Sequence, residues 1–170
     1  MHFGVKGKDN GEFSFPNDRL KKLQELLTML ADGTAHDPRA DCYSIAYWMR
    51  DHRLLGGNFQ LQTWKREKFK DQRSLASGDL IITALEYIHG QMPKLGRGLT
   101  PTERRTLMDC EQKIDPVYRG RTFVVPMHAA LHIGGGVMFS FYGSTLDAVF
   151  SSFKQMTRFY GGNYFEKISF

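Results

Sequence analysis

Two histidines four residues apart, His128 and His132, precede three consecutive glycines in the segment MHAALHIGGGVMFSFYG, residues 127–143. This spacing raises three possibilities: a metal site, a phosphate-binding loop, or one half of a catalytic pair. A metal-binding helix is disfavoured because three glycines and then β-branched and aromatic residues follow. A phosphate loop requires a strand, a glycine-rich turn and then a helix, whereas these glycines stand between two apolar runs. The favoured chemistry is therefore that of a catalytic pair whose other member lies elsewhere in the chain.

The apolar runs on both sides of the glycines predict a β-hairpin over residues 124–142. Residues two apart on a strand share a face, so His128, Ala130 and His132 should line one side of it. The small side chain of Ala130 leaves room for another group to approach the imidazoles. For His132 taken alone, a hydrogen-bonded, half-buried structural role is the better interpretation.

The segment DCYSIAYWMRDHRLL, residues 41–55, predicts a helix that begins at or next to Cys42. A helix N-terminus favours a thiolate, so we expect a lowered pKa for Cys42, and its N–H groups can bind an oxyanion. A lone cysteine is more often a small buried apolar residue, and only a partner such as His128 would make it a nucleophile. Cys110 lies between two acidic residues in a polar helix, and we assign it no catalytic role.

The 170 residues, 41% of them hydrophobic and without internal repeats, predict a single domain spanning residues 1–170. Two cysteines cannot form a disulfide framework or a four-cysteine zinc site, and we expect no metal or cofactor. The chain lacks a membrane-spanning apolar run and an N-terminal export signal, so we expect synthesis in the cytoplasm and no membrane insertion. The formal charge of +5 favours anionic partners. In residues 64–73, however, the cations alternate with acids and aromatics, which favours a solvated surface over nucleic-acid binding.

The rest of the pattern predicts helices first and an antiparallel sheet afterwards, which is an α+β plan. Thr100, Pro101 and Glu103 have the types and spacing of a helix start with a capping box. The polar and basic segment 86–121 is interpreted as a helical insertion. The remaining expected elements are a helix at 15–30, a turn and strand at 77–83, a short helix at 144–156 capped by Ser144, and a closing strand at 163–170.

Three segments in this order, DCYSIAYWMRD, SGDLIIT and MHAALHIGGGVMFS, resemble the NlpC family of papain-like bacterial cell-wall hydrolases over about residues 40–170. The resemblance implies a papain-like fold in which N-terminal helices, including the nucleophile helix, pack on an antiparallel sheet. It assigns Cys42 as the nucleophile, His128 as the general base and Ser140 as the residue that orients the imidazole. His132 and Asp147 are the alternatives for this third position.

The chain also departs from the family pattern. Tyr43 and Ser44 replace the usual Ser-Gly after the cysteine, and Ser140 stands where the family commonly has His, Asn or Gln. The segment between the Gly-Asp turn and His128 is much longer than usual, which suggests a wall that restricts the substrate.

The resemblance implies a cysteine amidase or endopeptidase that cleaves peptidoglycan stem peptides, with Cys42 attacking the amide carbonyl and His128 protonating the leaving amine. Without an export signal, such an enzyme would reach the periplasm or cell wall through phage lysis or tail machinery, or through contact-dependent type VI secretion. A cognate immunity protein and the secretion machinery are the partners implied. Two other functions remain open: a secreted toxin that cleaves or deamidates a host protein, and a non-enzymatic basic binding domain.

Overall fold

The computed structural model describes residues 17–58, 60–143 and 145–168. The chain has the expected α+β organisation, with two helices before the main strands. The elements are α1 (Asn17–Ala31), α2 (Ser44–Asp51), β1 (Arg66–Lys68), β2 (Leu80–Ile88), α3 (Pro101–Lys113), β3 (Thr122–Gly134), β4 (Val137–Phe141), β5 (Ala148–Ser152), α4 (Phe153–Tyr160) and β6 (Tyr164–Ile168). Short 3-10 turns occur at Gln60–Thr63, Gln72–Ser74 and Pro116–Tyr118.

The strands form one antiparallel sheet in the order β1-β6-β2-β3-β4-β5. The predicted hairpin is present as β3 and β4, and the predicted closing strand is β6. The edge strand β1 was not predicted, because residues 64–73 were interpreted as a solvated surface. Its alternating charges suit a short, largely exposed edge strand, where they discourage pairing with another chain.

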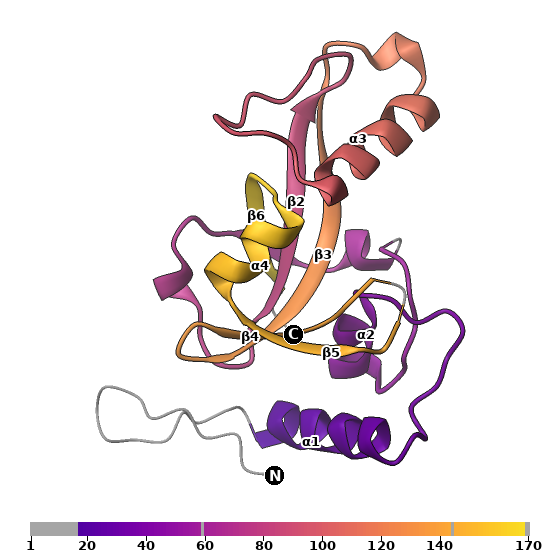
Figure 1. Cartoon of the computed structure of the whole chain (residues 1–170), viewed down its shortest axis with the longest axis vertical. Coiled ribbons are helices and arrows are strands. Elements are labelled where there is room, and N and C mark those ends of the chain that lie inside the picture. Colours follow the sequence, from indigo (N-terminus) through magenta and orange to yellow (C-terminus); the bar gives the residue numbers. More distant parts are fainter. Residues whose placement is uncertain (1–16, 59, 144, 169–170) are drawn as a thin grey trace.

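The two faces of the sheet are covered by different helices (Figure 1). The larger core places α1 and α2 against alternate residues of β3, among them Ala129 and Leu131. The opposite face, in front of the sheet in Figure 1, packs α4 against the intervening residues, among them Ala130. This confirms the predicted alternation along β3.

The segment 144–156 is not the short helix that the sequence suggested. It forms strand β5 followed by helix α4, and its predicted cap, Ser144, lies outside the described residues. The helix begins instead at a capping box made by Ser152 and Gln155. The residues of β5, Ala148–Ser152, alternate in exposure and pair with β4. Phe150 of this strand packs edge-on against Phe139 of β4. Cross-strand pairing therefore outweighs the local preference for helix.

The predicted insertion is a loop and helix between the far ends of β2 and β3. These strands extend as a long hairpin, and α3 packs against its end through Leu107, which contacts a cluster with Leu85 and Tyr87 (Figure 1). Helix α3 begins as predicted, with Thr100 as the cap and Glu103 completing the capping box.

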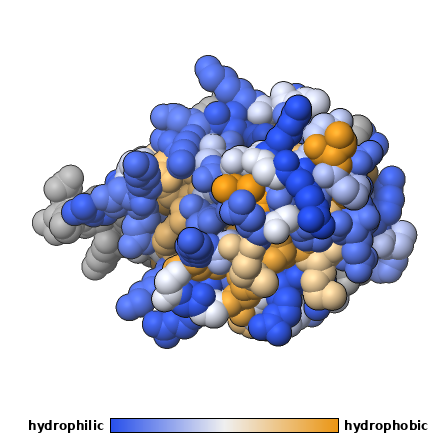
Figure 2. Space-filling model, turned by 90° about the horizontal axis from the view of Figure 1, so that it is seen from above, coloured by the Kyte–Doolittle hydropathy of each residue, from blue (hydrophilic) through white to orange (hydrophobic). Residues whose placement is uncertain are grey.

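Hydrophilic side chains cover most of the face shown in Figure 2, with hydrophobic side chains scattered among them. None of the helices in the described ranges has the length and apolar character needed to span a membrane.

Candidate active site

Cys42 lies in the turn that leads into α2. The carboxylate of Asp41 accepts the N–H groups of Tyr43 at 2.8 Å and Gly57 at 2.6 Å, while the Asp41 N–H donates to the Ser44 hydroxyl at 2.9 Å. Asp41 thus holds the turn, and the helix begins at Ser44, two residues after Cys42. The Tyr43 N–H is therefore occupied by Asp41, whereas the N–H of Cys42 itself lies near the thiol.

The Cys42 thiol contacts the edge of β3. Its Sγ lies 3.9 Å from the carbonyl oxygen of Met127, to which it can donate a weak hydrogen bond. The N–H of Ala129 also interacts with the sulfur. These two backbone groups flank His128, in the part of β3 that lies before Leu131, where pairing with β4 begins. The thiol therefore occupies part of a strand edge that would otherwise be unpaired.

Burial raises the pKa of the Cys42 thiol to about 12. The nearby Asp41 carboxylate adds to this rise, and the N–H groups of Ala129 and Cys42 oppose it only in part. The predicted lowering of this pKa is wrong. The helix begins after Cys42, and the Asp41 carboxylate, which holds the turn before the helix, places negative charge beside the sulfur.

His128 is fully buried in β3, where it pairs with Thr83 next to a β-bulge. Its ring stacks on the ring of Tyr160 at the end of α4, with centroids 3.6 Å apart and planes 14° from parallel. Neither ring nitrogen has a hydrogen-bond partner among the described residues. Burial lowers the pKa of His128 to about 3, so the imidazole is neutral at physiological pH. A buried polar group without a partner is uncommon and calls for an explanation.

The structure does not form the predicted hydrogen bond between His128 and Ser140. Equal hairpin arms about Gly134 would place these residues opposite each other, but Leu131 pairs with Phe139. The hairpin is therefore centred on Gly135 rather than Gly134. This register places Ser140 opposite Ala130, two positions after His128. Ser140 itself is buried and pairs with a residue of β5 on its other side.

The two alternative partners do not reach His128 either. The ring of His132 lies between backbone groups, with Nδ1 2.9 Å from the carbonyl oxygen of Ala76 and Nε2 accepting the Gly136 N–H at 3.2 Å. These two contacts give His132 the hydrogen-bonded structural role that its own sequence position predicted. They connect the β3–β4 turn to the loop before β2. Asp147 accepts a hydrogen bond from Thr145 at 3.0 Å within the loop between β4 and β5.

Cys42 and His128 line the same pocket, which has a volume of about 560 Å³. One wall is a face of α3, another is the end of α4, and the loop after β4 completes the rim. The other lining residues are Asp41, Tyr43, Pro101, Thr102, Arg105, Thr106, Asp109, Pro126, Met127, Tyr142, Gly143, Thr145, Phe159 and Tyr160. Helix α3, from the segment predicted to be an insertion, thus lines one side of this pocket.

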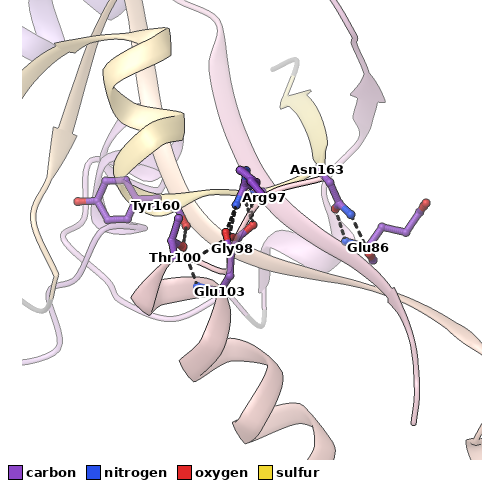
Figure 3. A network of polar contacts seen from close by, with 8 residues as sticks. Glu86, Arg97, Gly98, Thr100, Glu103, Tyr160 and Asn163 are labelled. Atoms are coloured by element: carbon purple, nitrogen blue, oxygen red, sulfur yellow. Dashed lines mark hydrogen bonds and ion pairs between the residues drawn. The ribbon is translucent and has the colours of Figure 1, made fainter. Parts of the chain in front are cut away.

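A buried carboxylate joins two of these walls (Figure 3). Glu103 of α3 accepts hydrogen bonds from Arg97 at 2.7 and 3.0 Å, from the Thr100 N–H at 2.8 Å and from the Gly162 N–H at 2.8 Å. The Thr100 hydroxyl donates to the carbonyl oxygen of Tyr160 at 2.8 Å. This network fastens the start of α3 to the end of α4, which carries the ring that covers His128.

Comparison with protein-family models, curated proteins and solved structures gave no match. Within the described ranges, no group of three or more His, Cys, Asp or Glu side chains could hold a metal ion. The sequence did place Cys42 and His128 in one candidate site, but it missed Tyr160. The adjacent Gly161-Gly162 pair was the available signal, because it marks a close backbone approach at the end of a helix.

Proposed function

We propose that this protein is a cysteine hydrolase of papain-like type that cleaves amide bonds, with Cys42 as nucleophile and His128 as general base. One observation carries the proposal: a thiol and a fully buried imidazole from distant segments line one pocket, and neither nitrogen of this imidazole is hydrogen-bonded to any residue that the structure describes. Such an imidazole can take its missing partners from the thiol and the substrate.

In the proposed reaction, His128 accepts the thiol proton as Cys42 Sγ forms a bond to the amide carbonyl carbon. The carbonyl electrons move to oxygen, which the Cys42 N–H can stabilise. When the C–N bond breaks, His128 returns the proton to the leaving amine and an acyl-enzyme remains. Water, deprotonated by His128, then attacks the thioester and releases the acid and the thiol.

Peptidoglycan stem peptides are the proposed substrate, as the resemblance to the NlpC family implies. The formal charge of +5 suits an anionic wall. Delivery to the cell wall or periplasm by a contact-dependent or phage-derived route, with a cognate immunity protein, belongs to the same proposal.

The test is hydrolysis of purified sacculi, followed by the release of free amines, alongside a panel of host proteins as competing substrates. We expect wild-type protein and Cys110→Ala to release amines, and Cys42→Ala to release none while keeping the same circular dichroism spectrum. Cys110 is the matched control because it is the other free cysteine and lies outside the pocket. Activity in Cys42→Ala would exclude the proposed nucleophile, and cleavage or deamidation of a host protein alone would replace the proposed substrate.

A further inference from the structure

We propose that Tyr160 is the positioning residue of the site: its ring holds the His128 ring in place by stacking, in the absence of a hydrogen-bonded third residue. This inference rests on the proposed function, because it concerns the base of that reaction. The two rings lie nearly parallel, with centroids 3.6 Å apart, and no other ring is stacked on His128 among the described residues.

Stacking orients an imidazole differently from a hydrogen bond. The lone pair and the N–H of the ring lie in its plane, whereas a stacked ring covers only the face. A hydrogen-bonding partner occupies one nitrogen, while Tyr160 occupies neither. Both nitrogens of His128 are unbonded among the described residues, and in the proposed reaction one serves the Cys42 thiol and the other a substrate group or water that enters its buried site.

None of the candidates for a third residue forms a hydrogen bond with His128 in the described part of the chain. His132 is held by two backbone groups and Asp147 by Thr145, while the register sets Ser140 opposite Ala130 rather than His128. Within residues 17–58, 60–143 and 145–168, no hydrogen bond to either ring nitrogen fixes the rotation of the His128 ring about its side-chain bonds. The stack with Tyr160 is the contact that can do so.

The backbone around Tyr160 is held firmly, as positioning requires (Figure 3). Its carbonyl oxygen accepts the Thr100 hydroxyl, and Gly162, two residues on, donates its N–H to Glu103. Gly161 has a φ of +84°, and a Cβ there would collide with the Glu103 carboxylate. The chain thus leaves α4 in a conformation that only glycine adopts easily, against a buried charge.

The experiment compares Tyr160→Phe, which keeps the stacked ring, with Tyr160→Leu, which removes it. Phe153→Leu is the control for general weakening of α4, because Phe153 packs against Phe69 and Phe165 away from the pocket. The readouts are kcat and KM on sacculus peptides, and the His128 ring signals and pKa by NMR, which need no substrate.

We expect Tyr160→Phe to match wild type in both readouts. Tyr160→Leu should lower kcat at least about tenfold with KM nearly unchanged, since loss of orientation acts on the chemical step. Its His128 pKa should rise towards the ordinary value of about 6.5 as water enters. Phe153→Leu should leave kcat and the His128 signals unchanged.

The possible failures are distinguishable. Suppose first that the wild-type protein hydrolyses sacculi. If Tyr160→Leu then keeps the wild-type kcat, or if its His128 NMR signals do not move, the positioning role is overturned and the proposed function stands. If wild type hydrolyses nothing but Tyr160→Leu alone shifts the His128 signals, the stack is confirmed as the contact that fixes the ring. The proposed reaction would then be the part that falls.

Discussion

Removing the charge of Glu103 should destabilise the fold, because Arg97 and two backbone N–H groups are hydrogen-bonded to its buried carboxylate. Burial alone would raise the pKa of this carboxyl, but hydrogen bonds from Arg97, the Thr100 N–H and the Gly162 N–H outweigh it and hold the pKa at about 2, against 4.5 ordinarily. This difference corresponds to about 3 kcal/mol in favour of the charged form. Because the Arg97 side chain is partly exposed, solvent screening lowers this stabilising free energy to about 2–3 kcal/mol.

We therefore expect Glu103→Gln, which resembles the protonated acid in shape, to lower the free energy of unfolding by about 2–3 kcal/mol at pH 7. Because the pKa is depressed in the folded state, the stabilisation is present above about pH 4.5 and is lost as pH falls through about 2. Urea denaturation of both proteins between pH 7 and pH 2 measures the difference between them at each pH.

The matched control is Glu67→Gln, which removes an exposed carboxylate 3.9 Å from Lys167 and should change stability by less than about 0.5 kcal/mol. A loss below about 1 kcal/mol for Glu103→Gln, or a difference between the two proteins that does not shrink in acid, would show that the Glu103 charge does not stabilise the fold.

Three further measurements test the site and its supports. With a pKa of about 12, Cys42 should be alkylated by iodoacetamide about tenfold faster per pH unit from pH 7 to pH 10, and a plateau near neutrality would contradict its buried setting. Gly161→Ala should lower the melting temperature far more than Gly96→Ala, since both have positive φ but only the first meets Glu103; equal losses would contradict this. His132→Ala should cost about 1–3 kcal/mol of stability by leaving its backbone partners unpaired, measured by urea denaturation. It should also reduce turnover less than His128→Ala, for which we expect at least about a hundredfold.

Those elements that carry strong local signals could be predicted from the sequence. The glycine run between β-forming segments predicted the hairpin, and Thr100, Pro101 and Glu103 predicted the start of α3. Strands β1 and β5 carry no comparable signal, since each is short, lies at an edge and is defined by its partner strand. Their formation depends on pairing across the sheet, which a single segment does not encode.

The candidate site could be predicted in its two reactive residues but not in its geometry. The register near Ser140 depends on where the hairpin turns, and three glycines allow the turn to move by a residue. Tyr160 is 32 positions from His128, and its stacking depends on how α4 packs on the sheet. The pKa of Cys42 depends on burial and on the Asp41 carboxylate. The position of Cys42 near the start of a helix, taken alone, therefore predicted a lowered pKa where the pKa is raised.

The pKa values of the pair indicate how the proposed reaction must proceed. Burial raises the pKa of Cys42 to about 12 and lowers that of His128 to about 3, so the proton stays on sulfur until the substrate is attacked. The reactant is then a neutral thiol and a neutral imidazole, not a thiolate–imidazolium pair. The proton moves to His128 while the carbon–sulfur bond forms, as negative charge passes to the carbonyl oxygen. A proton that moves during the attack slows it in heavy water. We therefore expect a solvent deuterium isotope effect clearly above one on acylation, measured in single-turnover experiments. An effect at or below one would mean that the thiolate forms before the attack, and that substrate binding reverses the order of the two pKa values.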